Sequence, residues 1–167
     1  MPIVVRRATG EDVGTLVQLN RTVQDLHVRL YPGDFKQVVT ELDAAVFFSG
    51  RLRTPDCVFG IAEVDLTPVG YVWFDLQFRP ETPFTPGRRR LYVHHVSVVP
   101  EAQRRGIGSA LMDYVGRQGV LEAAEEIALA TWSANLGAQR FFVSHGFTGF
   151  TVAFRKTLVT DVEGAVP

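Results

Sequence analysis

Two glycines and two arginines gather in the segment Gln103-Arg104-Arg105-Gly106-Ile107-Gly108-Ser109. An apolar stretch that ends at Pro100 precedes the segment and an amphipathic stretch follows it, so we expect a strand-to-helix junction here. The start of a helix aims unpaired backbone N–H groups at one point and carries partial positive charge. Gly106 and Gly108 would let a ligand approach the backbone closely. The turn therefore suits a diphosphate, although close packing of a helix on a sheet would also account for the glycines.

Two other phosphate-binding patterns do not fit this segment. The nucleotide-binding loop needs a lysine followed by Ser or Thr, and the lysines of this chain are Lys36 and Lys156, far from the turn. The dinucleotide fingerprint needs a third glycine and an early strand–helix–strand unit, and neither fits. We therefore do not interpret the turn as a nucleotide or dinucleotide site.

Two adjacent histidines stand in the alternating stretch Tyr92-Val93-His94-His95-Val96-Ser97-Val98. Histidine ordinarily titrates near neutral pH, so either ring is a candidate general base. In a regular strand, successive side chains point to opposite faces, which would put Tyr92 and His94 on one face and His95 on the other. Two histidines that point apart are a poor metal site, and we expect no metal. A strand histidine can equally be a hydrogen-bonded structural residue.

The elements that must position these residues follow from the hydrophobic period and the turn signals. We predict strands over 3–7, 58–64, 69–78, 90–99 and 127–131, and one or two closing strands over 147–158. We predict a first helix capped by Thr9, then helices over 35–48, 105–118 and 135–144, the second with Val38, Val39, Leu42, Ala45 and Val46 turned inward. This order predicts an α/β fold of the α+β kind, a mixed sheet with helices on its faces.

Length and composition fit a single domain, residues 1–167, with a core over about 3–158 and a tail over 159–167. The net charge of −1 argues against a nucleic-acid partner, because phosphate binding needs a basic surplus. No apolar run approaches the ~18 residues of a membrane span. No signal segment is recognised at the N-terminus. A cytoplasmic protein without a membrane partner is therefore the default expectation.

The single cysteine, Cys57, lies in an apolar run and is interpreted as a buried strand residue, not as a nucleophile. It cannot form an internal disulfide, which is consistent with a reducing compartment. A basic patch surrounds a loop that contains three prolines, and it consists of Arg79, Arg88, Arg89 and Arg90. We interpret the patch as a solvated loop, with an anionic substrate or the phosphates of a cofactor as the alternative.

Two motifs resemble the GNAT superfamily of N-acetyltransferases. Gln103 to Gly108 is similar to that family's Q/R-x-x-G-x-G/A signature, and Asn135 to Phe147 is similar to its N-x-x-A-x-x-[LF]-[YF]-x-x-x-G-F segment. The order and separation of the motifs also agree, so the resemblance covers about residues 3–158. It implies a GNAT-like fold, with a central, mostly antiparallel sheet, helices on both faces and strands splayed apart at the cofactor site.

The resemblance also implies that acetyl-CoA is the cofactor and CoA the product. Backbone amides of the turn would bind the pyrophosphate, while the strand before it would pair with the pantetheine arm and supply an oxyanion donor. Asn135 matches a position that often contacts this arm, besides capping the helix that follows. The implied cofactor-binding residues are Val96, Val98, Val99, Gln103, Arg104, Arg105, Gly106, Ile107, Gly108, Ser109, Asn135 and Phe142.

In similar proteins, acids or histidines at the positions of Tyr92 and His94 often face the acceptor. His94 is therefore the expected base, with Tyr92 beside it. Phe142 departs from the family pattern, because many members have a tyrosine there that protonates the leaving thiolate. Three alternatives stay open: the thiolate needs no acid, another group replaces the tyrosine, or the enzyme is weak or inactive. The candidate replacements are Tyr92, Tyr114, Ser144 and water.

The activity that the resemblance implies is direct transfer of an acetyl group to a primary amine of a small molecule or peptide. His27, Tyr31 and Asp34, near the end of the first helix, are implied contacts for the acceptor. The acceptor stays open among a polyamine, an amino acid, an aminoglycoside, an arylamine and a protein N-terminus. An inactive acetyl-CoA sensor or partner module is the rival hypothesis, and a plain α/β domain without cofactor is a third. Because members are often dimers, a homodimer is also left open.

Overall fold

The computed structural model describes residues 2–158 of the chain. Its strands are β1 (Ile3–Arg7), β2 (Cys57–Val64), β3 (Thr67–Arg79), β4 (Arg88–Val98) and β5 (Glu126–Leu129). Its α-helices are α1 (Val13–Leu30), α2 (Glu41–Leu52), α3 (Ile107–Leu121) and α4 (Leu136–Ser144). Two short 3₁₀ turns, η1 (Gly10–Asp12) and η2 (Pro100–Ala102), precede α1 and α3. The predicted strands up to residue 131 and all the predicted helices except the second are confirmed to within a few residues.

The strands form one five-stranded sheet in the order β1-β2-β3-β4-β5. The first four strands are antiparallel neighbours, and β5 is parallel to β4. Asp65 and Leu66 join β2 to β3 with positive φ angles of 48° and 62°, which is the backbone twist that favours a two-residue hairpin turn. The predicted mixed, mostly antiparallel sheet is therefore confirmed.

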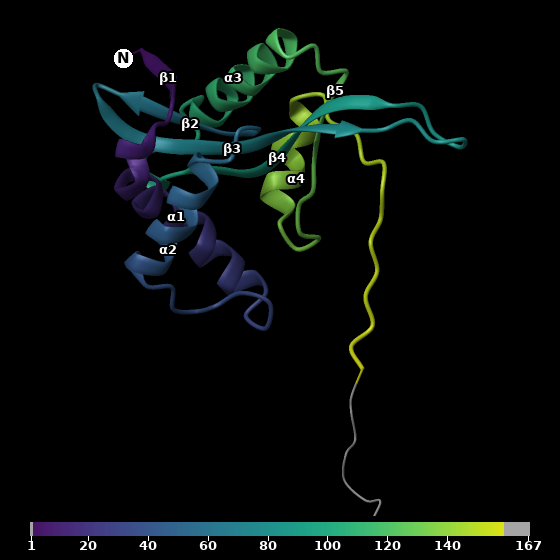
Figure 1. Cartoon of the computed structure of the whole chain (residues 1–167). Coiled ribbons are helices and arrows are strands. Elements are labelled where there is room, and N and C mark those ends of the chain that lie inside the picture. The colour runs from purple at the N-terminus through teal and green to yellow at the C-terminus, as the bar shows by residue number, and fades with distance from the viewer. Residues whose placement is uncertain (1, 159–167) are drawn as a thin grey trace, which may run out of the picture. The chain divides into compact units, whose positions relative to one another are not determined.

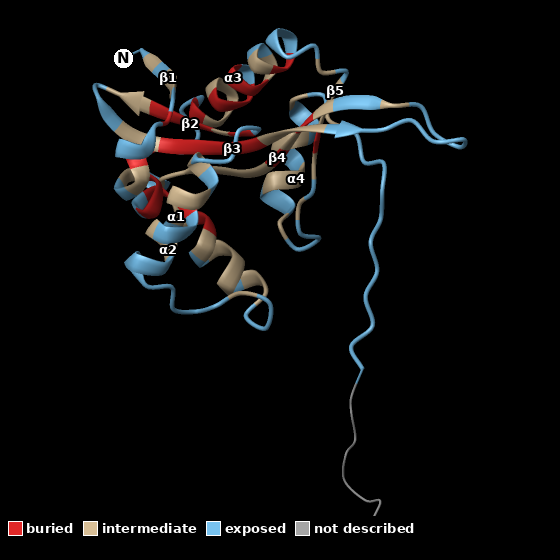
Figure 2. Ribbon diagram, viewed as in Figure 1, coloured by how far each residue is buried: buried red, intermediate tan, exposed pale blue. Residues whose placement is uncertain are grey.

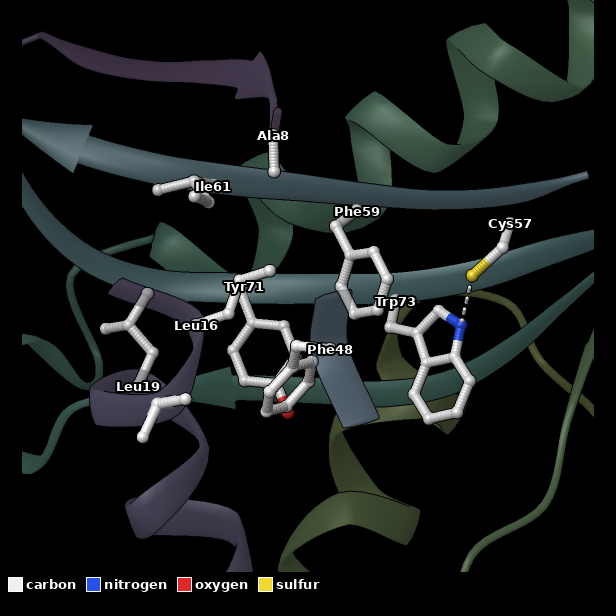
Figure 3. Packing of buried hydrophobic residues seen from close by; sticks show 10 residues of the cluster. Ala8, Leu16, Leu19, Phe48, Cys57, Phe59, Ile61, Tyr71 and Trp73 are labelled. Atoms are coloured by element: carbon white, nitrogen blue, oxygen red, sulfur yellow. Dashed lines mark hydrogen bonds between the residues drawn. The ribbon is translucent and has the colours of Figure 1, made fainter. Parts of the chain in front are cut away.

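Helices cover both faces of this sheet: α1 and α2 pack on one face and α3 on the other (Figure 1). Aromatic side chains fill the first interface, where the ring of Phe48 lies 5.7 Å from that of Phe59 and 6.3 Å from that of Tyr71 (Figure 3). On the other face, Leu111 and Val115 of α3 are fully buried. Burial is greatest along the middle of β2 and β3 and on the inner side of α3 (Figure 2). The sheet is therefore held from both sides.

A polar network fixes the path of the chain into α1. The Thr9 hydroxyl accepts a hydrogen bond from the Glu11 N–H at 3.3 Å, and the Asp12 carboxylate accepts one from the Thr9 N–H at 2.8 Å. The Arg6 guanidinium binds both oxygens of Asp12 at 2.9 and 2.8 Å. These hydrogen bonds, the one from Arg6 above all, lower the pKa of Asp12 to about 2. Thr9 is therefore confirmed as an N-cap, of the turn η1 that leads into α1.

The helix predicted over 35–48 begins later than expected. Thr40 is its N-cap, and the Thr40 hydroxyl accepts a hydrogen bond from the Asp43 N–H at 3.0 Å. The later start changes which side chains face the sheet: Phe48 is buried and Ala45 is partly buried, as predicted for Ala45. The prediction is wrong for the remaining inward residues, which are exposed: Val38, Val39, Leu42 and Val46.

The chain divides after Asn135 into two compact units, and α4 belongs to the second. α4 ends at Ser144, and Gly146 follows with a φ of 82°, as expected for a glycine that ends a helix. Residues 147–158 form no strand, so the predicted closing strands are wrong. Apolar residues do alternate there, but an alternating pattern forms a strand only where a neighbouring strand completes its hydrogen bonds. The predicted tail over 159–167 lies outside the described residues.

Candidate active site

A β-bulge interrupts β4 at His94. Trp73 of β3 lies opposite His95, and the next residue of β3, Phe74, lies opposite Val93. His94 is therefore an extra residue in β4, placed between two regular pairs. A bulge of this kind breaks the strict alternation of side chains between the two faces of a sheet.

Because of the bulge, His94 and His95 lie on the same face of the sheet. The Trp73 ring stacks on His94 with centroids 4.3 Å apart and meets His95 edge-on at 5.2 Å. The Tyr92 ring is 5.0 Å from His94. The predicted split of the two histidines is therefore wrong, and the prediction that Tyr92 lies beside His94 is right.

The imidazole of His94 is held by a carboxylate. Its Nε2 lies 2.7 Å from Oδ2 of Asp75 on β3. The other carboxylate oxygen of Asp75 accepts a hydrogen bond from the Trp73 indole N–H at 3.3 Å. A carboxylate only accepts hydrogen bonds, so neutral His94 carries its proton on Nε2 and keeps a lone pair on Nδ1. Both partners are about a quarter exposed, 26% for His94 and 24% for Asp75, so Asp75 can orient the ring while solvent reaches the pair.

His95 lies deeper and is held by neutral groups. Its Nδ1 is 2.8 Å from the hydroxyl of Tyr71, which donates a hydrogen bond to Oδ1 of Asn20 at 2.8 Å. Burial, followed by the charges of His27 and His94, lowers the pKa of His95 to about 4. Burial also lowers the pKa of His27. At neutral pH His95 is therefore uncharged and a weaker base than an ordinary histidine.

The edge of β4 opens directly after Val93. β5 pairs with β4 only from Arg90 opposite Glu126 to Val93 opposite Leu129. Within residues 2–158, the β4 segment 94–98 has no partner strand on this side. A strand edge offers backbone N–H and C=O groups that an extended ligand can pair with. An extended molecule on this edge would therefore end beside the two histidines.

The glycine-rich turn stands at the far end of the same strand. Gly106 is the N-cap of α3 and has a φ of 83°, a left-handed conformation that L side chains rarely adopt. Arg104 also has a positive φ, 60°. The Gln103 side-chain amide donates a hydrogen bond to the carbonyl of Val98 at 3.0 Å and so ties the turn to β4. The open strand edge thus connects a helix N-terminus suited to an anion with a histidine held by a carboxylate.

The acetyltransferase (GNAT) family model matches residues 21–147 of this chain. The match covers more than half of the sequence. The chain belongs to the GNAT acetyltransferase family. This membership confirms the family to which the two sequence motifs pointed. A search of curated proteins found no match.

Solved structures share the GNAT fold of this chain at low sequence identity. The tetramutant of the BH1408 protein from Bacillus halodurans aligns with a TM-score of 0.86 and 19% identity, covering 93% of this chain and 99% of that one. The aminoglycoside N-acetyltransferase AAC(6')-Iy in complex with CoA aligns with a TM-score of 0.67 and 18% identity, covering 94% and 96%. A ribosomal-protein-alanine N-acetyltransferase from Brucella melitensis biovar Abortus 2308 gives 0.70 and 17%, covering 94% and 100%. At these identities the likeness shows the fold.

The cofactor residues implied by the GNAT resemblance occupy several kinds of position. Val96 and Val98 of β4 lie opposite Val72 and Gly70 of β3. The Val99 N–H, just past β4, donates a hydrogen bond to the carbonyl of Val69 at 2.9 Å. Ile107 is 2% exposed, so its side chain belongs to the core. The side chains of Arg104 and Arg105 are exposed at the turn, where Gly108 and Ser109 begin α3. Asn135 closes a turn after β5 through its N–H and the Trp132 carbonyl at 2.8 Å.

Of the three acceptor candidates, His27 packs against a site histidine, and Tyr31 is linked to His27 through the rings of Trp132 and Phe35. His27, on α1, has its ring centroid 6.3 Å from that of His95. Tyr31 follows α1, and its ring lies 4.6 Å from that of Trp132. Asp34 is exposed, and its N–H donates a hydrogen bond to the Tyr31 carbonyl at 3.0 Å. The structure therefore brings His27 and Tyr31 to the site, while Asp34 lies at its exposed margin.

The side chains considered as replacements for the missing tyrosine acid belong to different elements of the chain. Tyr114, on α3, packs 6.3 Å from the ring of Phe74 on the face opposite His94, and burial raises its pKa. Phe142 and Ser144 lie in α4, in the second unit, where the Ser144 hydroxyl donates a hydrogen bond to the Phe141 carbonyl at 2.7 Å. Tyr92 is the candidate that lies beside His94.

Two further sequence interpretations are confirmed. Cys57 is buried in β2, and burial, with Asp75 nearby, raises the pKa of its thiol to about 12. Two of the four arginines of the basic patch make exposed ion pairs, Arg88 with Glu126 at 3.0 Å and Arg89 with Glu122 at 3.5 Å. The half-buried Arg90 instead donates hydrogen bonds to the Gln77 side-chain oxygen and lies 5.3 Å from the centre of the Tyr92 ring.

Sequence reasoning missed Asp75, Trp73, Phe35 and the Tyr71–Asn20 pair. A signal for Asp75 was available, because it is the one charged residue in the apolar run from Val69 to Leu76. A charge in such a run indicates a partner or a function. Phe35 gave no such signal, since its role depends on the loop before α2.

No helix within residues 2–158 combines the length and the apolar character that crossing a membrane requires. That range also contains no group of three or more His, Cys, Asp and Glu side chains arranged to hold a metal ion.

Proposed function

We propose that this GNAT protein is an acetyl-CoA-dependent N-acetyltransferase that moves an acetyl group directly to a primary amine. The observation that carries the proposal is a coincidence of three features on β4. The strand loses its β5 neighbour after Val93, it bulges at the next residue, His94, and it ends at the turn that starts α3.

The residues present fit acetyl-CoA. The N-terminus of α3 and the exposed Arg104 and Arg105 would hold the pyrophosphate, since helix starts bind anions. The open edge of β4, residues 94–98, would pair with the extended pantetheine arm. When bound, acetyl-CoA supplies the acetyl group as a thioester. The backbone N–H groups of the same edge would stabilise negative charge that develops on the acyl oxygen. The CoA-bound neighbour with the same fold agrees with this assignment.

His94 would act as the general base. An ammonium ion cannot attack, so the acceptor must lose a proton before or during transfer. Asp75 holds the Nε2–H of His94, which leaves Nδ1 to take that proton directly or through one water molecule. The carboxylate then balances the charge of the imidazolium that forms. His95, with its pKa lowered to about 4, would stay neutral beside it.

Thermal unfolding with and without acetyl-CoA, combined with release of free CoA thiol in the presence of an amine panel, tests the proposal. A ligand bound only by the folded chain raises the unfolding midpoint. We expect such a rise, lost in Gly106→Val, because a branched side chain at a φ of 83° would distort the turn. Gly149→Val, a change at an exposed glycine with open space around it, is the matched control.

The two parts of the test separate the proposal from its rivals. A midpoint shift without thiol release on any amine would support an acetyl-CoA sensor that does not catalyse transfer, and it would overturn the enzymatic proposal. No shift at any concentration would leave a plain α/β domain.

A further inference from the structure

Five rings form a continuous surface beside the proposed base, and we call them the aromatic wall: His27, Tyr31, Phe35, His95 and Trp132. The His27 ring lies 6.3 Å from that of His95 and stacks on Phe35 at 4.5 Å. Phe35 meets Trp132 edge-on at 5.2 Å, and Trp132 lies 4.6 Å from Tyr31. The wall therefore runs from β4 to the surface without a break.

The wall is built from three separate segments that hydrogen bonds hold together. The Tyr31 hydroxyl, just past α1, lies 2.9 Å from the Ser133 hydroxyl and accepts a hydrogen bond from the Ala134 N–H at 2.9 Å. These bonds fix the end of α1 against the segment that follows β5. The Gln24 side chain donates a hydrogen bond to the Lys36 carbonyl at 2.8 Å, which fixes the loop that carries Phe35. The rings are thus preorganised at the open side of β4.

The wall offers π faces and apolar area but little charge. Burial lowers the pKa values of both of its histidines, so they are neutral at pH 7. Of the carboxylates next to this surface, Asp75 already accepts hydrogen bonds from His94 and Trp73, and Asp34 lies at the exposed margin. An acceptor with several ammonium groups would need several carboxylates to pair with them, whereas an aromatic ring would pack against the wall directly.

We propose that the acceptor is an arylalkylamine, with its ring against the aromatic wall and its amino group toward Nδ1 of His94. The inference rests on the proposed function, because it names the substrate class of the same site. The aromatic body supplies binding energy at the wall and the alkyl chain carries the nitrogen to the base. The same surface disfavours polyamines and aminoglycosides, although the fold is shared with an aminoglycoside N-acetyltransferase.

The test compares acceptors on the full chain with saturating acetyl-CoA. The panel is 2-phenylethylamine, tryptamine, spermidine, kanamycin and a peptide with a free N-terminal alanine. We expect kcat/KM for the two arylalkylamines to exceed that of the other acceptors by about tenfold or more, the discrimination that an apolar pocket gives. A higher kcat/KM for spermidine, kanamycin or the peptide would overturn the inference and leave the acetyltransferase function standing.

Variants test whether the aromatic wall is the reason for the expected preference for arylalkylamines. Phe35→Ala should raise KM for 2-phenylethylamine about tenfold with kcat almost unchanged, and Phe35→Leu, which keeps apolar volume, should raise it less. Phe84→Ala, at a side chain that is 94% exposed on the loop between β3 and β4, is the control and should change neither. An unchanged KM in Phe35→Ala, with the fold intact by circular dichroism, would contradict the assignment.

A binding measurement keeps the inference testable if no amine is acetylated. Titration of 2-phenylethylamine in the presence of CoA should change tryptophan fluorescence saturably, because Trp132 belongs to the wall. The change should be smaller in Trp132→Phe, in which the signal comes from Trp73, the indole beside His94 and His95. Saturable binding without turnover would support the wall and contradict the enzymatic function, while turnover without saturable binding of the arylalkylamine would do the reverse.

Discussion

On the α3 face of the sheet, two glycines are packed too closely to admit another carbon atom, whereas the α1 and α2 face carries three histidines and a carboxylate. A Cβ on Gly70 would lie 2.7 Å from the Ser97 carbonyl oxygen, and one on Gly60 would lie 2.8 Å from the ring of Tyr114. On the other face, His94 and His95 lie around Trp73, at ring distances of 4.3 and 5.2 Å.

The contrast shows how one strand serves both faces. Val93 and Val96 of β4 keep their regular pairing with Phe74 and Val72, so the apolar face stays continuous under α3. The bulge inserts its extra residue, His94, on the opposite face without disturbing that packing. One face therefore provides stability, and the other can hold polar groups that would be costly in a close-packed core.

The largest effect should come from the base. We expect His94→Gln to lower kcat/KM for the amine about 100-fold or more, the contribution typical of general base catalysis. The unfolding midpoint should barely change, because the side chain is partly exposed. Steady-state kinetics of CoA release measure the loss, with His145→Gln, just past α4, as the control. Activity within threefold of the unchanged chain would rule out His94 as the base.

The polar face should also make stability depend on pH. The pKa of His95 is lowered to about 4, so the unfolded chain takes up this proton first as the pH falls. The stability that the neutral, buried His95 contributes is fully present above pH ~6.5 and is lost as the pH falls toward about 4. Across this pH window, the free energy of unfolding should fall by on the order of 2 kcal/mol less in His95→Gln than in the unchanged chain.

Urea unfolding at several pH values across that window measures this difference. The carboxylate of Asp12 does not interfere, because its pKa, lowered to about 2, places its own contribution at lower pH. Equal losses of stability in the variant and the unchanged chain would show that another group is responsible.

On the α3 face, the free energy of unfolding should depend on side-chain volume and not on pH. Gly70→Ala should lower the free energy of unfolding by about 2 kcal/mol, because the added carbon meets a backbone oxygen that cannot move aside. Gly116→Ala, on α3 with open space around it, is the matched control and should raise it by about 0.5–1 kcal/mol. Urea unfolding of both variants at neutral pH gives the comparison, and a neutral Gly70→Ala would mean that β3 and β4 can move apart.

The sequence predicted what depends on local pattern. The β5 and α3 boundaries, the N-cap at Thr9 and the glycine-rich turn follow from short-range signals that the chain carries within a few residues. Membership of the GNAT family followed from two motifs, Gln103 to Gly108 and Asn135 to Phe147. These features need no knowledge of which strands become neighbours.

What could not be predicted depends on partners distant in sequence. The bulge at His94 arises from the register between β3 and β4, and alternation within β4 alone gives the wrong face for one histidine. Asp75 became a site residue only when that register placed it 2.7 Å from His94. The prediction of closing strands over residues 147–158 failed for the same reason, because their alternating pattern says nothing about whether a neighbouring strand is present.

The smallest expected effect concerns the partner of the base. Asp75→Asn keeps the size of the side chain but removes the charge that balances a protonated His94. A hydrogen bond to a charged group contributes about 1.5–3 kcal/mol and part of it survives in the amide, so we expect kcat to fall about tenfold. Asp56→Asn, an exposed aspartate just before β2, controls for the loss of one negative charge. A merely structural role of Asp75 would lower the unfolding midpoint but leave kcat within threefold of the unchanged chain, and KM for acetyl-CoA should not change in either case.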